Sequence, residues 1–140
     1  MKKRSFTYAL SLMTIFCLLI SAATAAAPNS EVDQLRLGRI TSLTAELSIT
    51  AGQADCYSVA RLRNSSDSVT LTMKLQRSSN GTSWTTLKTW TATGRGSVEL
   101  TKNWSVAPGF YYQTVATAEV YTSSGSLAES ATFSSPVVKY

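Results

Sequence analysis

The chain of 140 residues contains no histidine, only two cysteines and only three prolines, and 15% of its residues are charged. Without histidine it cannot build a Ser-His-Asp or Cys-His nucleophile system, or a metal site with imidazole ligands. Cys17 lies in an apolar N-terminal segment, which leaves Cys56 alone for the folded part. We therefore expect no intramolecular disulfide and no thiolate metal site, and a domain held together by packing and hydrogen bonds.

The acidic residues are also few, at eight, and they are scattered along the chain. Carboxylate catalysis requires two acids at a defined separation, and no such pair stands out. The only glycine-rich candidate for a phosphate loop, "TGRGS", is too short and opens a strand rather than a helix. The sequence therefore predicts no enzyme, no cofactor and no bound metal.

One long apolar run is present, and it lies at the N-terminus. Basic residues 2–4 precede "ALSLMTIFCLLISAATA", and Ala23 and Ala25 fit the A-x-A cleavage pattern. We expect residues 1–25 to be a signal peptide that is removed before Ala26, so that the protein is secreted and leaves the membrane. An uncleaved membrane anchor is the alternative, which the short apolar run disfavours.

Removal of this segment changes the charge balance. The full chain has 13 Lys+Arg and 8 Asp+Glu. Three of the basic residues lie in the signal, so the remainder carries 10 − 8 = +2, without a basic cluster. Nucleic acid is therefore not an expected partner, because no stripe of cations is available to neutralise phosphates.

The rest of the chain reads as a flexible lead-in over residues 26–38 and one β domain over residues 39–140. Apolar and polar residues alternate in "LTAELSI", "ADCYSVARLR" and "VTLTMKLQR", and the pattern continues after the Asn80-Gly81 turn. About seven such segments are separated by Ser/Gly/Asn turns, with a tail over 137–140 that can resume pairing. The pattern predicts a two-sheet antiparallel β-sandwich.

Particular residues favour an immunoglobulin-like version of this sandwich. Tyr112 follows the Pro108-Gly109 bend, where a tyrosine corner would bond back to the upstream backbone. Cys56 falls at the inward position of the first core cysteine, so we expect a buried, inert thiol. Thr114 occupies the position of the second cysteine, and Met73 stands where antibody domains carry a core tryptophan.

The segments "SITAGQADC", "LTMKLQRSSNGTSWTTLKTW", "WSVAPGFYYQ" and "AEVYTSSGSLAES" together span most of residues 40–140. In this arrangement the chain resembles a group of small, signal-bearing secreted proteins of Gram-positive bacteria. The resemblance implies a secreted immunoglobulin-like domain and no activity, because its motifs are turn and core signatures.

Exposed aromatic residues are the candidates for a binding surface. By strand parity the outward tyrosines are Tyr57, Tyr111 and Tyr121, with Arg61, Arg63 and Gln113 as neighbouring hydrogen-bond donors. Trp84, Trp90 and Trp104 are open to two interpretations, core packing or an exposed platform, and Leu87 lies on the opposite face from Trp90 unless a bulge intervenes. Glu129 shares its face with apolar residues and is expected to be an edge charge that prevents pairing.

Two classes of function remain. The first is a secreted, non-catalytic module that binds a protein or an envelope glycan, with a monomer favoured. The second is a structural extracellular domain that associates with itself through an unprotected edge strand. An exposed aromatic patch would favour the first class, and a long uncharged edge strand the second.

Overall fold

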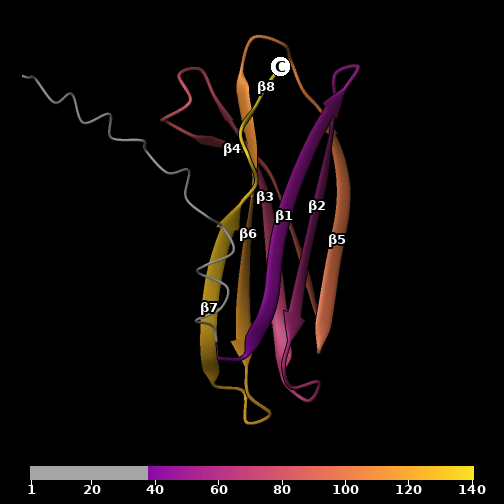
Figure 1. Ribbon diagram of the computed structural model, residues 1–140, viewed down its shortest axis with the longest axis vertical. Helices are drawn as coiled ribbons and strands as arrows, with labels where there is room; N and C mark the ends of the chain where they lie inside the picture. The colour runs from indigo at the N-terminus through magenta and orange to yellow at the C-terminus, as the bar shows by residue number, and fades with distance from the viewer. Residues whose placement is uncertain (1–37) are drawn as a thin grey trace, which may run out of the picture.

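The computed structural model describes residues 38–140, so the expected signal peptide and nearly all of the expected lead-in lie outside the described residues. Within residues 38–140 the protein is an antiparallel β-sandwich, as predicted (Figure 1). Its strands are β1 (Ile40–Thr50), β2 (Gln53–Leu62), β3 (Ser68–Ser78), β4 (Thr85–Arg95), β5 (Ser97–Ser105), β6 (Tyr111–Tyr121), β7 (Leu127–Ser134) and the short β8 (Val138–Lys139). This part of the chain has no helix long and apolar enough to cross a membrane.

The strands form two sheets whose order follows an immunoglobulin-like Greek key. One sheet has the order β1-β2-β5, and the other has the order β4-β3-β6-β7, with β8 paired to β6 beside β7. Alternate residues of the central strands β3 and β6 are buried, and they form one core with the inward residues of β1 and β2. The burial of these apolar side chains between the sheets is the main force that holds the two layers together.

The β1–β2 hairpin has a two-residue turn. Ala51 and Gly52 have φ angles of 49° and 79°, the left-handed pair that a type I′ turn requires. The predicted turn after β3 also has a glycine with positive φ, Gly81 at 77°. There the side-chain oxygen of Asn80 accepts hydrogen bonds from the backbone N–H groups of Thr82 and Ser83, both at 2.9 Å.

The residues predicted to mark an immunoglobulin-like core occupy the expected places. The ring of Tyr112 is fully buried, and its hydroxyl donates a hydrogen bond of 2.6 Å to the carbonyl of Ala107. Cys56 is a buried, free cysteine, and Met73 is fully buried on β3. The tyrosine corner therefore ties β6 to the chain that enters it from β5.

We expect the Tyr112→Phe variant to lose about 1–3 kcal/mol of unfolding free energy, because the Ala107 carbonyl would keep its place without its donor. The measurement is urea unfolding followed by tryptophan fluorescence. Tyr111→Phe is the matched control, since the neighbouring ring is half-exposed, and it should unfold at the wild-type midpoint. An unchanged midpoint for Tyr112→Phe would show that water replaces the hydrogen bond without cost.

A bulge decides the placement of the side chains on β4. Leu75 pairs with Lys88 and Gln76 pairs with Thr86, so Leu87 is the extra residue. Both Leu87 and Trp90 consequently pack against the core. The sequence pattern alone put them on opposite faces, and the bulge resolves that conflict.

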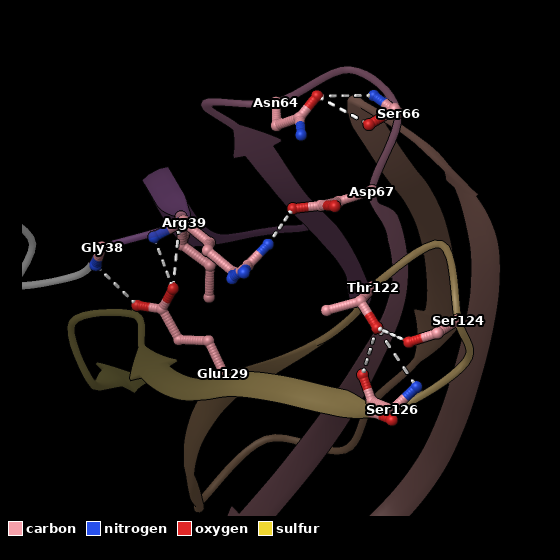
Figure 2. Close-up of polar contacts among 10 residues, drawn as sticks. Gly38, Arg39, Asn64, Ser66, Asp67, Thr122, Ser124, Ser126 and Glu129 are labelled. Atoms are coloured by element: carbon pink, nitrogen blue, oxygen red, sulfur yellow. Dashed lines mark hydrogen bonds and ion pairs between the residues drawn. The ribbon is translucent and has the colours of Figure 1, made fainter.

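Glu129 was predicted to be an edge charge, and in the structure it also binds the backbone at the start of β1. Its carboxylate on β7 accepts hydrogen bonds from the backbone N–H groups of Gly38, Arg39 and Ile40, at 3.0, 2.5 and 3.3 Å (Figure 2). Nearby, the Arg39 guanidinium forms an ion pair of 2.6 Å with Asp67, which is only 3% exposed. These contacts fix the start of β1 against β7 and against the β2–β3 loop.

Candidate functional site

The six residues predicted to form a binding surface lie on two different sheets. Tyr57 and Arg61 are on β2, and Arg63 follows that strand. The other three, Tyr111, Gln113 and Tyr121, are on β6. Because β2 and β6 belong to opposite layers, their outward side chains point in opposite directions. The six residues therefore do not form one surface, since strand parity predicts an outward face but not the sheet to which it belongs.

Tyr57 lies on the outer face of the three-stranded sheet, in acidic surroundings. It is half-buried and pairs with Glu46 on β1. Partial burial raises the pKa of its hydroxyl, and the nearby carboxylate of Glu99 raises it further, while Arg61 acts in the opposite direction. An anionic ligand is therefore disfavoured at this position.

Tyr111 and Tyr121 stand at the two ends of β6, which has 11 residues. At a rise of about 3.3 Å per residue they are roughly 33 Å apart, too far for one small ligand. Burial raises the pKa of the Tyr121 hydroxyl, and so does Glu119, to which this hydroxyl donates a hydrogen bond of 3.4 Å. Tyr121 is thus held by its own strand neighbour.

Tyr111, in contrast, lies beside cationic and amide groups. The ammonium of Lys139 is 5.2 Å from the centre of its ring. Two residues along β6, Gln113 donates a hydrogen bond of 2.8 Å to Gln76 on β3. Of the six predicted residues, Tyr111 and Gln113 thus share the outer face of the five-stranded sheet at the start of β6.

The tryptophans divide between the two interpretations left open by the sequence. Trp90 is partly buried against the core. Trp104, near the end of β5, is 41% exposed, and the ammonium of Lys88 lies 4.9 Å from its ring centre. Trp84 is half-buried in the loop before β4. Trp90 therefore contributes to stability, whereas Trp104 offers an aromatic ring to the surroundings.

A third cation–aromatic pair lies at the same end of the sandwich, where the guanidinium of Arg77 is 4.4 Å from the ring centre of Phe110. The strand ends concerned carry the β3–β4 loop, the β5–β6 loop and the C-terminus, in the upper part of Figure 1. We call this region the aromatic–basic end, and define it by Arg77, Phe110, Lys88, Trp104, Lys139 and Tyr111.

The charges of the two ends differ. Lys102, two residues before Trp104 on the same strand face, adds a fourth cation to the aromatic–basic end. Asp55, near the beginning of β2, is the carboxylate there. At the opposite end, arginines and carboxylates are mixed, as in the Arg39–Asp67 pair. The sequence gives little sign of this, because the cations come from four separate strands and only their pairing gathers them.

The remaining chemistry of residues 38–140 is sparse. In this range no group of three His, Cys, Asp or Glu side chains is placed to hold a metal ion. Burial raises the pKa of the Cys56 thiol, the Thr114 side chain acts in the opposite direction, and Asp55 raises it. Thr114 Oγ1 itself is buried without a hydrogen bond of good geometry, so its contact with the thiol is weak. No protein-family model and no curated protein matches the chain.

Proposed function

We propose that this protein is a secreted, non-catalytic binding module that contacts an acidic glycan through the aromatic–basic end. The observation that carries the proposal is Trp104, which is 41% exposed and has the Lys88 ammonium above its ring. Sugar rings stack on exposed aromatic rings, and neighbouring ammonium groups supply charge for carboxylate or phosphate substituents. The absence of histidine from the sequence supports binding rather than catalysis.

The surroundings of Trp104 favour a charged sugar over an apolar partner. Lys102 lies on the same strand face, and Tyr111 with Lys139 repeats the pairing of a ring and an ammonium group on the other sheet. Cation–aromatic pairs of this kind help to hold the rings in place, and each exposed pair contributes about 0.5–1 kcal/mol. The rings are thus positioned before a ligand arrives.

The test is titration calorimetry of the secreted protein with polygalacturonate, and with neutral dextran as the uncharged control. We expect binding to polygalacturonate that weakens with salt, since screening reduces the attraction of the lysines. Trp104→Ala should weaken it at least tenfold, or about 1.4 kcal/mol. Tyr57→Ala is the matched control and should bind like wild type, because Tyr57 lies on the acidic outer face of this sheet whereas Trp104 lies on its inward face.

Equal affinity for dextran, or undiminished binding by Trp104→Ala, would remove the acidic glycan from the proposal. Absence of glycan binding together with capture of a defined protein that Trp104→Ala abolishes would assign the same surface to a protein partner. Because Trp104 is 41% exposed but lies opposite the buried Ala54, its replacement should lower the unfolding midpoint and leave the protein folded, which thermal unfolding can check.

A further inference from the structure

The sandwich has four edge strands. In one sheet these are β1 and β5, and in the other they are β4 and β7, with β8 beside β7. An edge strand presents unpaired N–H and C=O groups that can pair with another chain, and proteins commonly block such pairing with an inward-facing charge, a proline or a bulge.

Three of the four edges are blocked in this way. Lys88 on β4 is opposite the buried Leu75, so it occupies an inward position, and the bulge at Leu87 adjoins it. Lys102 on β5 is opposite the buried Cys56. Glu129 on β7 has an inward position, and its carboxylate accepts hydrogen bonds from the backbone N–H groups of residues 38–40.

The fourth edge, β1, has no such block beyond its first residues. Its bulge lies between Ile40 and Ser42. From there to Thr50 the inward residues are Leu43, Ala45, Leu47 and Ile49, without proline or charge, and the outward face carries only Glu46 as a charged residue. Leu47 and Ile49 are only half-buried, so apolar surface remains beside this edge.

The hairpin geometry shows which backbone groups the edge offers. A two-residue turn makes Thr50 and Gln53 a hydrogen-bonded pair, after which bonded and non-bonded pairs alternate along β1 and β2. The N–H and C=O groups of Ala45, Leu47 and Ile49 therefore point away from β2. Within residues 38–140, no strand of the same sheet lies on that side.

We propose that β1 pairs with β1 of a second copy of this chain, antiparallel, across a two-fold axis at Leu47. In this register Ala45 pairs with Ile49 of the second copy, and Leu47 pairs with Leu47. The backbone groups of these residues that point away from β2 then bond to one another. Glu46 then lies opposite Ser48. The neighbouring register, with its axis at Glu46, would place two carboxylates opposite each other, which is unfavourable.

A second copy suits this edge better than an unrelated strand, because the edge is complementary to itself. The pairing brings Leu47 beside Leu47 and Ala45 beside Ile49, which buries the half-exposed apolar side chains of both copies. It joins the two three-stranded sheets into one continuous sheet, a closed two-fold assembly. The inference is independent of glycan binding. Because Leu47 lies near the turn end of β1, level with the part of β5 that carries Trp104, the two aromatic–basic ends would lie on either side of the two-fold axis and point in opposite directions.

Sedimentation velocity of the secreted protein over a range of concentrations tests the pairing. Wild type should show a reversible monomer–dimer equilibrium. Ile49→Pro should shift it to the monomer, because proline removes an edge N–H that points away from β2. Thr101→Pro is the matched control: its N–H points away from β2 on the blocked β5 edge, so the dimer should persist. A monomeric wild type, or a folded Ile49→Pro variant that still dimerises, would overturn the proposal.

Cross-linking tests the register. Glu46→Cys and Ser48→Cys variants, mixed and oxidised, should form a disulfide-linked dimer, because the two positions would face each other as a non-hydrogen-bonded pair. Glu46→Cys alone should cross-link much less. Efficient cross-linking of Glu46→Cys with itself would contradict the Leu47 axis, and no cross-link in the mixture would contradict the use of this edge.

Discussion

Thr114→Cys should form a disulfide with Cys56 under oxidising conditions and raise the unfolding free energy by about 4 kcal/mol. The estimate is the loop-closure entropy of a chain segment of this length in the unfolded state. Both side chains are buried in the core, on strands β2 and β6 of the two facing sheets, and these strands approach each other there. Unfolding in guanidinium, with and without a reducing agent, measures the gain.

The control for this variant is Thr114→Ser, which keeps a hydroxyl and adds no thiol, and its unfolding should not depend on the reducing agent. Reduced Thr114→Cys should likewise lose the gain. Two free thiols per chain in the oxidised, folded variant would show that positions 56 and 114 do not approach closely enough for a disulfide.

Glu129→Ala should lower the unfolding free energy by about 3 kcal/mol. The carboxylate accepts three backbone hydrogen bonds from residues 38–40, and hydrogen bonds to charged groups contribute about 1.5–3 kcal/mol when their partners are shielded from water. Gly38 is exposed, so water replaces that bond at little cost, and most of the loss comes from Arg39 and Ile40. Urea unfolding measures the change.

Glu46→Ala provides the comparison, because this carboxylate is exposed on β1 and its removal should change the stability by less than about 0.5 kcal/mol. Amide hydrogen exchange gives a local check: Ile40 should exchange faster in Glu129→Ala, with the centre of β6 less affected. If Glu129→Ala unfolds like Glu46→Ala, the contact does not hold β1 in solution.

Much of the fold could be predicted from local patterns. Alternation gave the strands, the Pro-Gly bend located Tyr112, and inward parity placed Cys56, because each depends on a few adjacent residues. The carboxylate contacts of Glu129 could not be predicted, since they join segments about 90 residues apart. The sequence showed only a charge at an inward position.

The binding surface was the part least accessible from sequence. Parity correctly indicated that Tyr57 and Tyr111 face outward, but their common surface required both strands to belong to one sheet, and they do not. The pairing of Lys88 with Trp104 arises where β4 and β5 meet across the open side of the sandwich. No spacing along the chain encodes that approach.

The described chain enters β1 at one pole of the molecule and ends at the other (Figure 1). A force applied between these two ends would run along β1 and along β8. Ladder hydrogen bonds lie perpendicular to their strands, so such a force would load the β1–β2 bonds in shear, all together, rather than open them one after another. The β1–β2 ladder should therefore resist extension of residues 38–140 along this direction.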